Sequence, residues 1–472
     1  MKKVTIIGAG QQGRSMAEAL ALVRDEYGEP KYQVSITDNT PETLAKFSAL
    51  VAGENITVHA SAVEAVQGAD ITVLATPIDR FSGVMQEIGS HMKPGAIVTD
   101  VGSAKVKSIE QIKDNLPNSA VYIPAHPIAG KAGVGPETGS ADMYDGATVM
   151  VVRGGPRTVT QQVVVEQMWQ DIGGKVTPMS AFEHDRLYGT ISHFQHVLAF
   201  AMTLAGEDEA RPGHADEHHM KSYNTMLDTT RISVASAPMW LAIFKDNKAA
   251  IQMAADGFKT RLATLKDSLE THDPDQPGTL YDLLNDAHEF RTGIKQDRAR
   301  ETVQAEVADL QAEQLGTPHT RGAVALCGMF NEAGQVALAK RTTVPTLISA
   351  ALTLNAMDVG DPQRTAGLAN PSFKDGSAAM LSHPEYLANL LHGNRRYVLE
   401  HLTAFEKQMD RIMDAVNRED EAALERLIEQ ASSIRKSMPA AHRPVRGEYA
   451  ADYHTYVGQL PPELAEAMQR AL

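Results

Sequence analysis

Apolar positions follow two different spacings along this chain, and the spacing changes near residue 180. Before that point, short apolar runs recur and helical patterns separate most of them; the runs lie at residues 3–7, 33–38, 56–60, 71–77, 96–102, 120–127 and 148–152. Such alternation predicts a doubly wound, mainly parallel α/β sheet. After that point, apolar positions recur at helical spacing, as in residues 250–270 and 395–416. We therefore expect an α/β domain followed by one or more all-helical domains.

The first apolar run leads into a glycine-rich turn, Gly8-Ala9-Gly10-Gln11-Gln12-Gly13, and a helical pattern follows it. A GxGxxG sequence between a strand and a helix is typical of a Rossmann-type domain, where the helix N-terminus binds the pyrophosphate of a dinucleotide. The first glycine permits the tight turn, the second lets the backbone approach the phosphates, and the third allows close helix–strand packing. The predicted phosphate-binding residues are Gly8, Gly10, Gln12 and Gly13.

The second apolar run ends in Asp38, whose position indicates which dinucleotide binds. A carboxylate there suits the ribose 2′-hydroxyl of NAD and repels the 2′-phosphate of NADP, and no arginine follows in residues 39–44. We therefore predict NAD as the cofactor; the alternative is a Rossmann-type fold without a bound cofactor. Strand ends at the carboxyl edge of such a sheet bind ligands, which adds four residues to the predicted cofactor site: Thr76, Pro77, Asp100 and Gly102.

Composition narrows the class of protein. The formal net charge of −15 argues against broad binding to nucleic acid or to an anionic membrane. No apolar run approaches the roughly 20 residues of a membrane span, and the N-terminus lacks the pattern of a secretory signal. Cys327 is the single cysteine, so we expect no internal disulfide and a small packing role for it. A cytoplasmic enzyme with a small-molecule substrate is the expectation.

Four residues are candidates for substrate chemistry. His126 follows a predicted strand, where its imidazole could act as a general base, and Ser103 follows the preceding strand, where it could bind a substrate hydroxyl. His193 and His196 lie three residues apart in an apolar helical stretch, which places both imidazoles on one face. They could bind a metal, bind substrate, or serve packing alone. A third ligand at motif spacing is missing, so we predict no metal site.

Several motifs occur in the order and spacing of one enzyme family. They are Gly8/Gly10/Gly13, Val101-Gly102-Ser103-Ala104-Lys105, His126-Pro127-Ile128-Ala129-Gly130, Asp145-Gly146, His184-Asp185, Ser192-His193-Phe194-Gln195-His196, Asp228-Thr229-Thr230-Arg231-Ile232 and Trp240. On these motifs, which cover about residues 1–300, the chain resembles the prephenate/arogenate dehydrogenase family of tyrosine biosynthesis. The resemblance implies NAD-dependent oxidative decarboxylation of prephenate to 4-hydroxyphenylpyruvate, or of arogenate to tyrosine.

The resemblance also implies roles for individual residues. His126 would accept the proton of the substrate hydroxyl, and Ser103 would hold that hydroxyl. Arg231 would bind the ring carboxylate, because a planar guanidinium suits bidentate contact. His193 and His196 would face the substrate from the helical region.

The chain departs from the family in one loop, where Ala132 occupies a position that is usually a glutamate near the arginine. This departure leaves Asp228 as the obvious local partner of Arg231, and it lets Lys131 add a contact to an anionic substrate.

The helical region contains an internal repeat pattern. A shift of 147 residues brings Asp228 onto Asp375, Asn247 onto Asn394, Ile251 onto Val398 and Phe258 onto Phe405, but it also brings Trp240 onto Leu387 and Arg231 onto Ala378. A shift of 150 brings His193 onto Thr343 and His196 onto Thr346. The second copy keeps packing positions and lacks the polar ones, which favours substrate-side roles for the two histidines. Chance similarity between amphipathic helices is the alternative.

The predicted organisation is an NAD-binding domain at 1–180, a helical substrate and dimerisation domain at 181–300, a degenerate helical repeat at 315–440, and a tail at 441–472. Related enzymes dimerise through the helical domain, so the chain is expected to be a homodimer or a monomer in which the repeat replaces the dimer partner. The histidine-rich segment 210–220 is interpreted as a solvated loop rather than a metal site. The alternative functions are a 3-hydroxyacid or 6-phosphogluconate-type dehydrogenase and a non-catalytic NAD-binding regulator.

Overall fold

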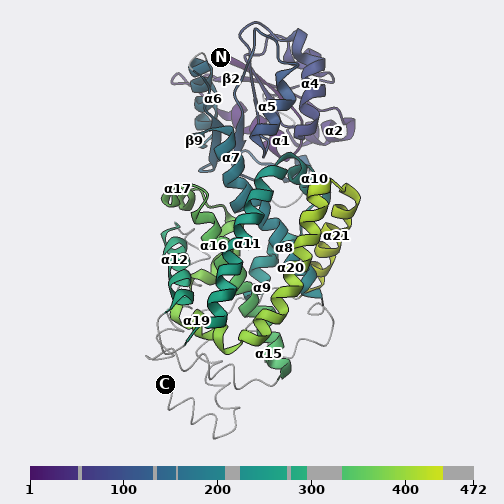
Figure 1. The fold of residues 1–472 in the computed structure, drawn as a ribbon. Coiled ribbons are helices and arrows are strands. Elements are labelled where there is room, and N and C mark those ends of the chain that lie inside the picture. Colours follow the sequence, from purple (N-terminus) through teal and green to yellow (C-terminus); the bar gives the residue numbers. More distant parts are fainter. Residues whose placement is uncertain are drawn as a thin grey trace. The chain divides into compact units, whose positions relative to one another are not determined.

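The computed structural model describes residues 1–51, 56–130, 135–155, 158–207, 224–273, 278–294 and 332–438. The chain forms two compact units, Met1–Asp185 and Arg186–Leu472 (Figure 1). Several sequence predictions concern residues outside the described ranges: Lys131, Ala132, Cys327, the segment 210–220 and the tail 441–472.

The first unit is built on a six-stranded parallel sheet in the order β3-β2-β1-β4-β5-β6. This strand order is that of a doubly wound dinucleotide-binding domain, so the predicted Rossmann-type fold is confirmed. The strands are β1 (Lys2–Ile7), β2 (Tyr32–Thr37), β3 (Ile56–Val58), β4 (Ile71–Leu74), β5 (Ile97–Asp100) and β6 (Val121–Tyr122).

A second, three-stranded sheet was not predicted. It has the order β7-β8-β9, with β7 (Ala125–Pro127) antiparallel to β8 (Thr148–Val152) and β9 (Lys175–Met179) parallel to it. The run 120–127 therefore forms two strands rather than one. Pro124 explains the break, because a proline has no N–H to continue a ladder. Residues 175–179 escaped prediction because their apolar signal is weak and they include Pro178.

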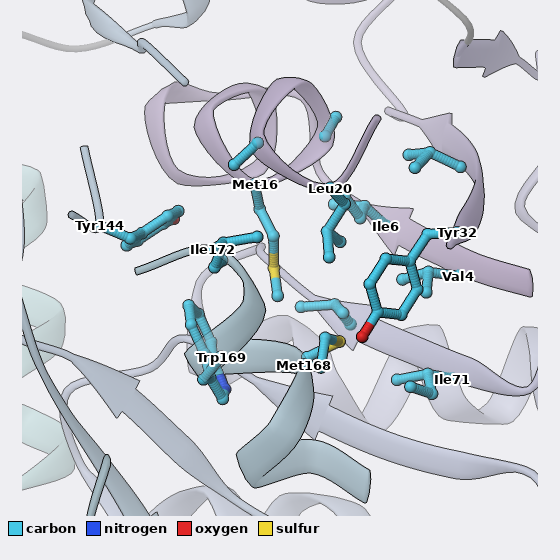
Figure 2. Close-up of a cluster of buried hydrophobic side chains, with 14 of the residues drawn as sticks. Val4, Ile6, Met16, Leu20, Tyr32, Ile71, Tyr144, Met168, Trp169 and Ile172 are labelled. Atoms are coloured by element: carbon cyan, nitrogen blue, oxygen red, sulfur yellow. The ribbon is translucent and has the colours of Figure 1, made fainter. Parts of the chain in front are cut away.

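Helices cover the sheets of the first unit: α1 (Gln11–Leu22), α2 (Pro41–Leu50), α3 (Ala62–Val66), α4 (Phe81–Ile88), α5 (Lys105–Lys113) and α6 (Val159–Asp171), with α7 (Ala181–Tyr188) at its end. Figure 2 shows how the core closes: Met16 and Leu20 of α1 and Met168 and Trp169 of α6 meet over apolar side chains of the sheet. All four side chains are fully buried. This packing holds α1 over the strand ends, and it thereby fixes the glycine turn that precedes α1.

The second unit is all-helical in the described residues, as predicted. Its α-helices are α8 (Phe194–Ala205), α9 (Asn224–Thr230), α10 (Ala237–Asp246), α11 (Lys248–Thr271), α12 (Thr279–Gly293), α15 (Glu332–Leu338), α16 (Val344–Met357), α17 (Pro362–Gly367), α18 (Pro371–Gly376), α19 (Pro384–Gly393), α20 (Arg395–Arg418) and α21 (Glu421–Ser437). Helices α8 and α16 are apolar nearly all round and buried, which identifies them as the centre of the unit. Of the helices described, none combines the length and apolarity needed to cross a bilayer.

Candidate active-site residues

The glycine turn before α1 has the geometry of a phosphate-binding loop. Gly8 has φ +112°, and a methyl group on it would lie 2.6 Å from the Ala75 carbonyl oxygen. A methyl group on Gly13 would lie 1.8 Å from the Gly8 carbonyl oxygen. These two glycines are therefore required by the fold itself. Gly10 differs, because a methyl group there would meet no atom within 4 Å. The open space at Gly10, beside the N-terminus of α1, is where a pyrophosphate would approach the backbone.

Two side chains predicted to contact the cofactor also hold this loop. The Asp38 carboxylate accepts hydrogen bonds from the backbone N–H groups of Ala9 at 2.7 Å and Thr40 at 2.8 Å. The Gln12 amide donates to the Ala129 carbonyl oxygen at 2.7 Å and accepts from the Tyr144 hydroxyl at 2.7 Å. Asp38 thus sits directly against the glycine turn, and the Gln12 side chain ties α1 to the loop after β7.

The residues that follow β4 and β5 were predicted to line the cofactor site. Thr76 follows β4, and among the described residues its Oγ1 atom is buried without a hydrogen-bond partner, as a group that awaits a ligand would be. Pro77 follows it as an exposed residue before a short 3₁₀ turn, Ile78–Arg80. Gly102 packs tightly, since a methyl group there would lie 2.8 Å from the Ile78 side chain.

Asp100 was predicted to bind the cofactor, and this is wrong for its side chain. The side chain is completely buried. It accepts hydrogen bonds from the Lys105 ammonium at 2.5 Å, the Tyr122 hydroxyl at 2.8 Å and the backbone N–H of Gly102 at 2.9 Å and Ala125 at 3.0 Å. The carboxylate is saturated by these donors, so it organises the strand ends rather than facing a ligand.

Lys105 is the buried cation of this cluster. Its side chain is fully buried, and its ammonium also donates to the Ala125 carbonyl oxygen at 2.7 Å, next to His126. Burial lowers the pKa of Lys105, and the Asp100 carboxylate opposes that shift. The pair fixes the start of β7, on which His126 lies.

His126 begins a chain of hydrogen-bonded side chains. Its Nδ1 atom lies 2.8 Å from Nε2 of His184, and Nδ1 of His184 lies 2.7 Å from the Asp185 carboxylate. Asp185 also accepts from the backbone N–H groups of Lys105 at 2.7 Å and Val106 at 2.8 Å. An acceptor-only carboxylate at one end sets the direction of donation: His184 donates to Asp185, and His126 donates to His184. The Nε2 atom of His126 is then its proton-accepting nitrogen.

The protonation states in this chain follow from burial and hydrogen bonding. Burial lowers the pKa of His184 and outweighs the opposing effect of Asp185, so its imidazole is neutral near pH 7. Burial alone would raise the pKa of the Asp185 carboxyl, but the hydrogen bonds from His184 and two backbone N–H groups outweigh it and lower that pKa. A neutral imidazole and an ionised carboxylate are the forms that orient His126 as a base.

The His184-Asp185 motif is visible in the sequence, but its orienting role and the structural role of Lys105 are apparent only in the structure. The signal that could have found them is an adjacent His-Asp pair at the start of a predicted helix, since such a pair can orient a third imidazole. Ser103, the other predicted catalytic residue, lies between β5 and α5, two residues before Lys105.

In the second unit, His193 and His196 lie around one tryptophan. His193 ends a π-helical turn, Gly189–His193, and the Asn247 amide lies 2.9 Å from its Nδ1 atom. The His196 ring stacks on Trp240 with centroids 3.5 Å apart and donates from Nδ1 to the Ser192 carbonyl oxygen at 3.1 Å. Burial lowers the pKa of His196 to about 3, so this imidazole is neutral at physiological pH.

Arg231 has a different partner from the one expected. Its Nε atom lies 2.5 Å from the Asp375 carboxylate, which comes from the distant segment between α17 and α19 rather than from Asp228 nearby. The Arg231 side chain remains 40% exposed, so the guanidinium is accessible while it is paired. Among the described residues, no group of three or more metal-ligating side chains could hold a metal ion.

Comparison with known proteins gives consistent matches. The model of the prephenate dehydrogenase nucleotide-binding domain matches residues 20–178. The model of the prephenate dehydrogenase dimerization domain matches residues 180–285 and 335–430.

Two curated relatives agree with these family matches. A cyclohexadienyl dehydrogenase of Zymomonas mobilis is 27% identical over 298 residues, which cover 63% of this chain and 97% of that protein. A prephenate dehydrogenase of Lactococcus lactis is 25% identical over 265 residues, 56% of this chain and 70% of that protein. Among solved structures, prephenate dehydrogenase from A. aeolicus, in complex with hydroxyphenyl propionate and NAD⁺, is 28% identical with a TM-score of 0.48 and covers 57% of this chain and 90% of that chain.

Proposed function

The chain belongs to the prephenate dehydrogenase family, and from this premise we propose that it oxidatively decarboxylates prephenate or arogenate with NAD as hydride acceptor. The observation that carries the proposal is the His126–His184–Asp185 chain, which prepares one imidazole nitrogen as a base in the domain that also holds the glycine turn. A non-catalytic NAD-binding regulator would need the glycine turn but not this base.

The reaction sets three tasks for the protein. The substrate is a cyclohexadienol, and hydride leaves the ring carbon that bears the hydroxyl. The ring carboxylate departs as CO₂ from the opposite carbon, and the ring becomes aromatic. The protein must therefore accept and return the hydroxyl proton, orient the hydroxyl-bearing carbon, and bind the carboxylate without holding it back. NAD, when bound at the glycine turn, supplies the hydride acceptor.

We assign the proton to the Nε2 atom of His126. Donation from Nδ1 of His126 to His184, and from His184 to Asp185, fixes the tautomer in which that nitrogen carries a lone pair. As positive charge develops on the His126 ring, the ionised Asp185 stabilises it through the neutral His184. Ser103 is assigned to the same hydroxyl as a hydrogen-bonding group.

Residues of the second unit are assigned to the rest of the substrate. Arg231 binds the ring carboxylate, and its exposed guanidinium can exchange Asp375 for a substrate oxygen. His193 and His196 contact the ring and the side chain, and His196 does so as a neutral imidazole held by the Trp240 face. A neutral His196 beside the Arg231 cation suits a carboxylate that must later leave, because excess positive charge would stabilise it.

The cofactor assignment rests on the fit of the loop to a dinucleotide. Gly10 faces open space, Thr76 has a buried hydroxyl without a partner among the described residues, and Asp38 stands where a ribose hydroxyl would be bound.

The test is the absorbance of NADH in assays that offer the full chain prephenate or arogenate, each with NAD or NADP. The proposal expects turnover with at least one substrate and a clear preference for NAD. No turnover in any of the four combinations, with NAD binding intact, would favour the regulator.

A further inference from the structure

The helical unit contains two segments with matching elements: the first helical segment, residues 186–294, and the second helical segment, residues 332–438. Each segment has a five-residue π-helical turn, Gly189–His193 in the first and Ala339–Thr343 in the second. Each has a 24-residue helix, α11 in the first and α20 in the second. The turns are offset by 150 residues and the long helices by 147, which are the two shifts found in the sequence.

One buried hydrogen bond is repeated at these offsets. Asn247 precedes α11, and its amide lies 2.9 Å from Nδ1 of His193 at the end of the first π turn. Asn394 precedes α20, and its amide lies 3.1 Å from Oγ1 of Thr343 at the end of the second. The same connection thus survives although the histidine of the first segment is a threonine in the second.

The packing between the segments is reciprocal. Helix α8 of the first segment packs against α20 and α21, and its counterpart α16 packs against α11 and α12. Likewise α10 packs against α21, and its counterpart α19 packs against α12 (Figure 1). Contacts in which each half uses the same elements on the other are the signature of a twofold, dimer-like arrangement. Here that arrangement lies within one chain.

Among the described residues, the ion pairs across this contact share one polarity. In six ion pairs between the segments, the cation belongs to the first segment and the carboxylate to the second: Arg231–Asp375, Lys245–Glu421, Lys248–Glu419, Lys259–Asp410, Arg261–Asp358 and Lys266–Glu406. A contact between two identical segments would carry each charge on both sides. The two faces are therefore complementary in charge to each other along these six pairs.

The offsets show what self-pairing would cost. Glu406 of the second segment occupies the position of Lys259 in the first. Two first segments paired in this way would place Lys266 against Lys259 of the other copy. Two second segments would place Glu406 against Asp410. At these two contacts facing like charges disfavour self-pairing, which is a common way to secure specificity, whereas the Arg231 contact would keep a carboxylate because Asp228 occupies the position of Asp375.

We propose that the second helical segment is a dedicated intrachain partner, and that the charges of the long helices α11 and α20 disfavour pairing of either segment with another copy of itself. The inference goes beyond the proposed reaction and does not depend on the substrate. One consequence concerns the site. The second segment has Thr343, Thr346 and Ala378 where the first has His193, His196 and Arg231. The two helical segments together then carry one set of substrate residues, all in the first segment. The second segment supplies Asp375, which forms an ion pair with Arg231.

Charge reversal in the full chain tests the specificity. Lys266→Glu and Glu406→Lys should each lower the melting temperature, and the double variant should recover most of the loss. Lys266 and Glu406 are only 30% and 31% exposed, so theirs is the least exposed of the six pairs, and the ammonium contacts both carboxylate oxygens at 3.1 Å. Lys107→Glu is the matched control, since it reverses an ion-paired lysine within the first unit. A double variant no more stable than the single variants would overturn the charge argument.

Cross-linking tests the intrachain pairing. A zero-length carbodiimide reagent should join Lys259 to Asp410 and Lys266 to Glu406 within single chains, so that these links appear in the band of the 51.0 kDa monomer. Light scattering should give the mass of the monomer or of a dimer. In a dimer, the cross-links at these positions should still join residues of the same chain. Links at these positions that join two chains, detected in mixed ¹⁴N and ¹⁵N protein, would overturn the proposal.

Discussion

The Nδ1 atom of His126 lies 2.8 Å from the Nε2 atom of His184, although the two residues are 58 positions apart. The contact gives each imidazole a single role. His184 donates a hydrogen bond to Asp185 and accepts one from His126, and this donation makes Nε2 the proton-accepting nitrogen of His126. This arrangement resembles the use of a carboxylate to orient a histidine base in hydrolytic triads, with a second imidazole inserted between them.

The first prediction concerns the base itself. His126→Asn should lower kcat by roughly 10²–10⁴-fold, which is the usual contribution of a positioned general base. NAD binding, measured by fluorescence titration, should change little, because the glycine turn lies on another element. Turnover close to that of the unchanged protein would remove His126 from the role of base.

The second prediction separates orientation from folding. His184→Gln should lower kcat by about tenfold or more, since an orienting partner can contribute up to roughly 10⁴ in triads. The dissociation constant of NAD should stay within about twofold of the unchanged protein. Because His184 is fully buried, the melting temperatures of the variant and the unchanged protein should also be measured, to detect any loss of folding. A parallel loss of turnover, NAD affinity and stability would indicate that His184 has only a structural role.

The third prediction compares two glycines of one motif. Gly13→Ala should destabilise the first unit by roughly 1–3 kcal/mol or more, because its methyl group would lie 1.8 Å from a backbone oxygen. Gly10→Ala should leave the melting temperature unchanged and weaken NAD binding, because its methyl group would enter the open space kept for the phosphates. Equal NAD affinity in Gly10→Ala and unchanged protein would contradict this placement of the cofactor.

Much of the fold could be predicted from the sequence because periodicity reports burial directly. The strand-like runs and the glycine turn predicted the parallel sheet and its strand-to-helix connection, and both are confirmed. The smaller sheet was missed because β9 contains Pro178 and has little continuous apolar character. A weak strand forms there because β8 offers it a paired edge, which is a tertiary effect that local pattern does not contain.

The candidate site was less predictable, because its geometry depends on contacts between distant residues. The sequence indicated His126, and the adjacent His184-Asp185 pair hinted at an orienting group, but local pattern does not show which imidazole that pair contacts across 58 positions. Asp100 illustrates the opposite error. A carboxylate at a strand end fits a cofactor role, but this one forms an ion pair with the buried ammonium of Lys105, five residues later. The predicted partner of Arg231, Asp228, was wrong for the same reason, because the actual partner, Asp375, lies 144 positions away in the sequence.

The fourth prediction concerns Arg231. Arg231→Ala should raise KM for the substrate by roughly 10–100-fold with a smaller change in kcat, as expected for a charge-assisted contact of about 1.5–3 kcal/mol made in ground and transition states alike. Lys248→Ala is a suitable control, since it also removes a cation paired across the helical segments. A fall in kcat at constant KM would mean that the contact forms only in the transition state.

The fifth prediction concerns pH and stability. Burial lowers the pKa of His196 to about 3 in the folded chain, against an ordinary value of 6.5. The unfolded chain therefore binds the extra proton first, so the contribution of His196 is complete above pH 6.5 and declines as the pH falls toward 3. Since each pKa unit corresponds to about 1.4 kcal/mol, the decline between pH 7 and pH 5 should reach about 2 kcal/mol.

Urea denaturation of the full chain at pH 5, 6, 7 and 8 measures this slope. The variant His196→Gln should be less stable at pH 8, because it loses the stacking on Trp240, but its stability should depend less on pH between 7 and 5. His91→Gln, at an exposed histidine of the first unit, should keep the slope of the unchanged protein. If His196→Gln keeps that slope as well, the imidazole is not held neutral by burial. Its role as a neutral group beside Arg231 would then have to be abandoned, because a protonated ring would add a second positive charge to the carboxylate site.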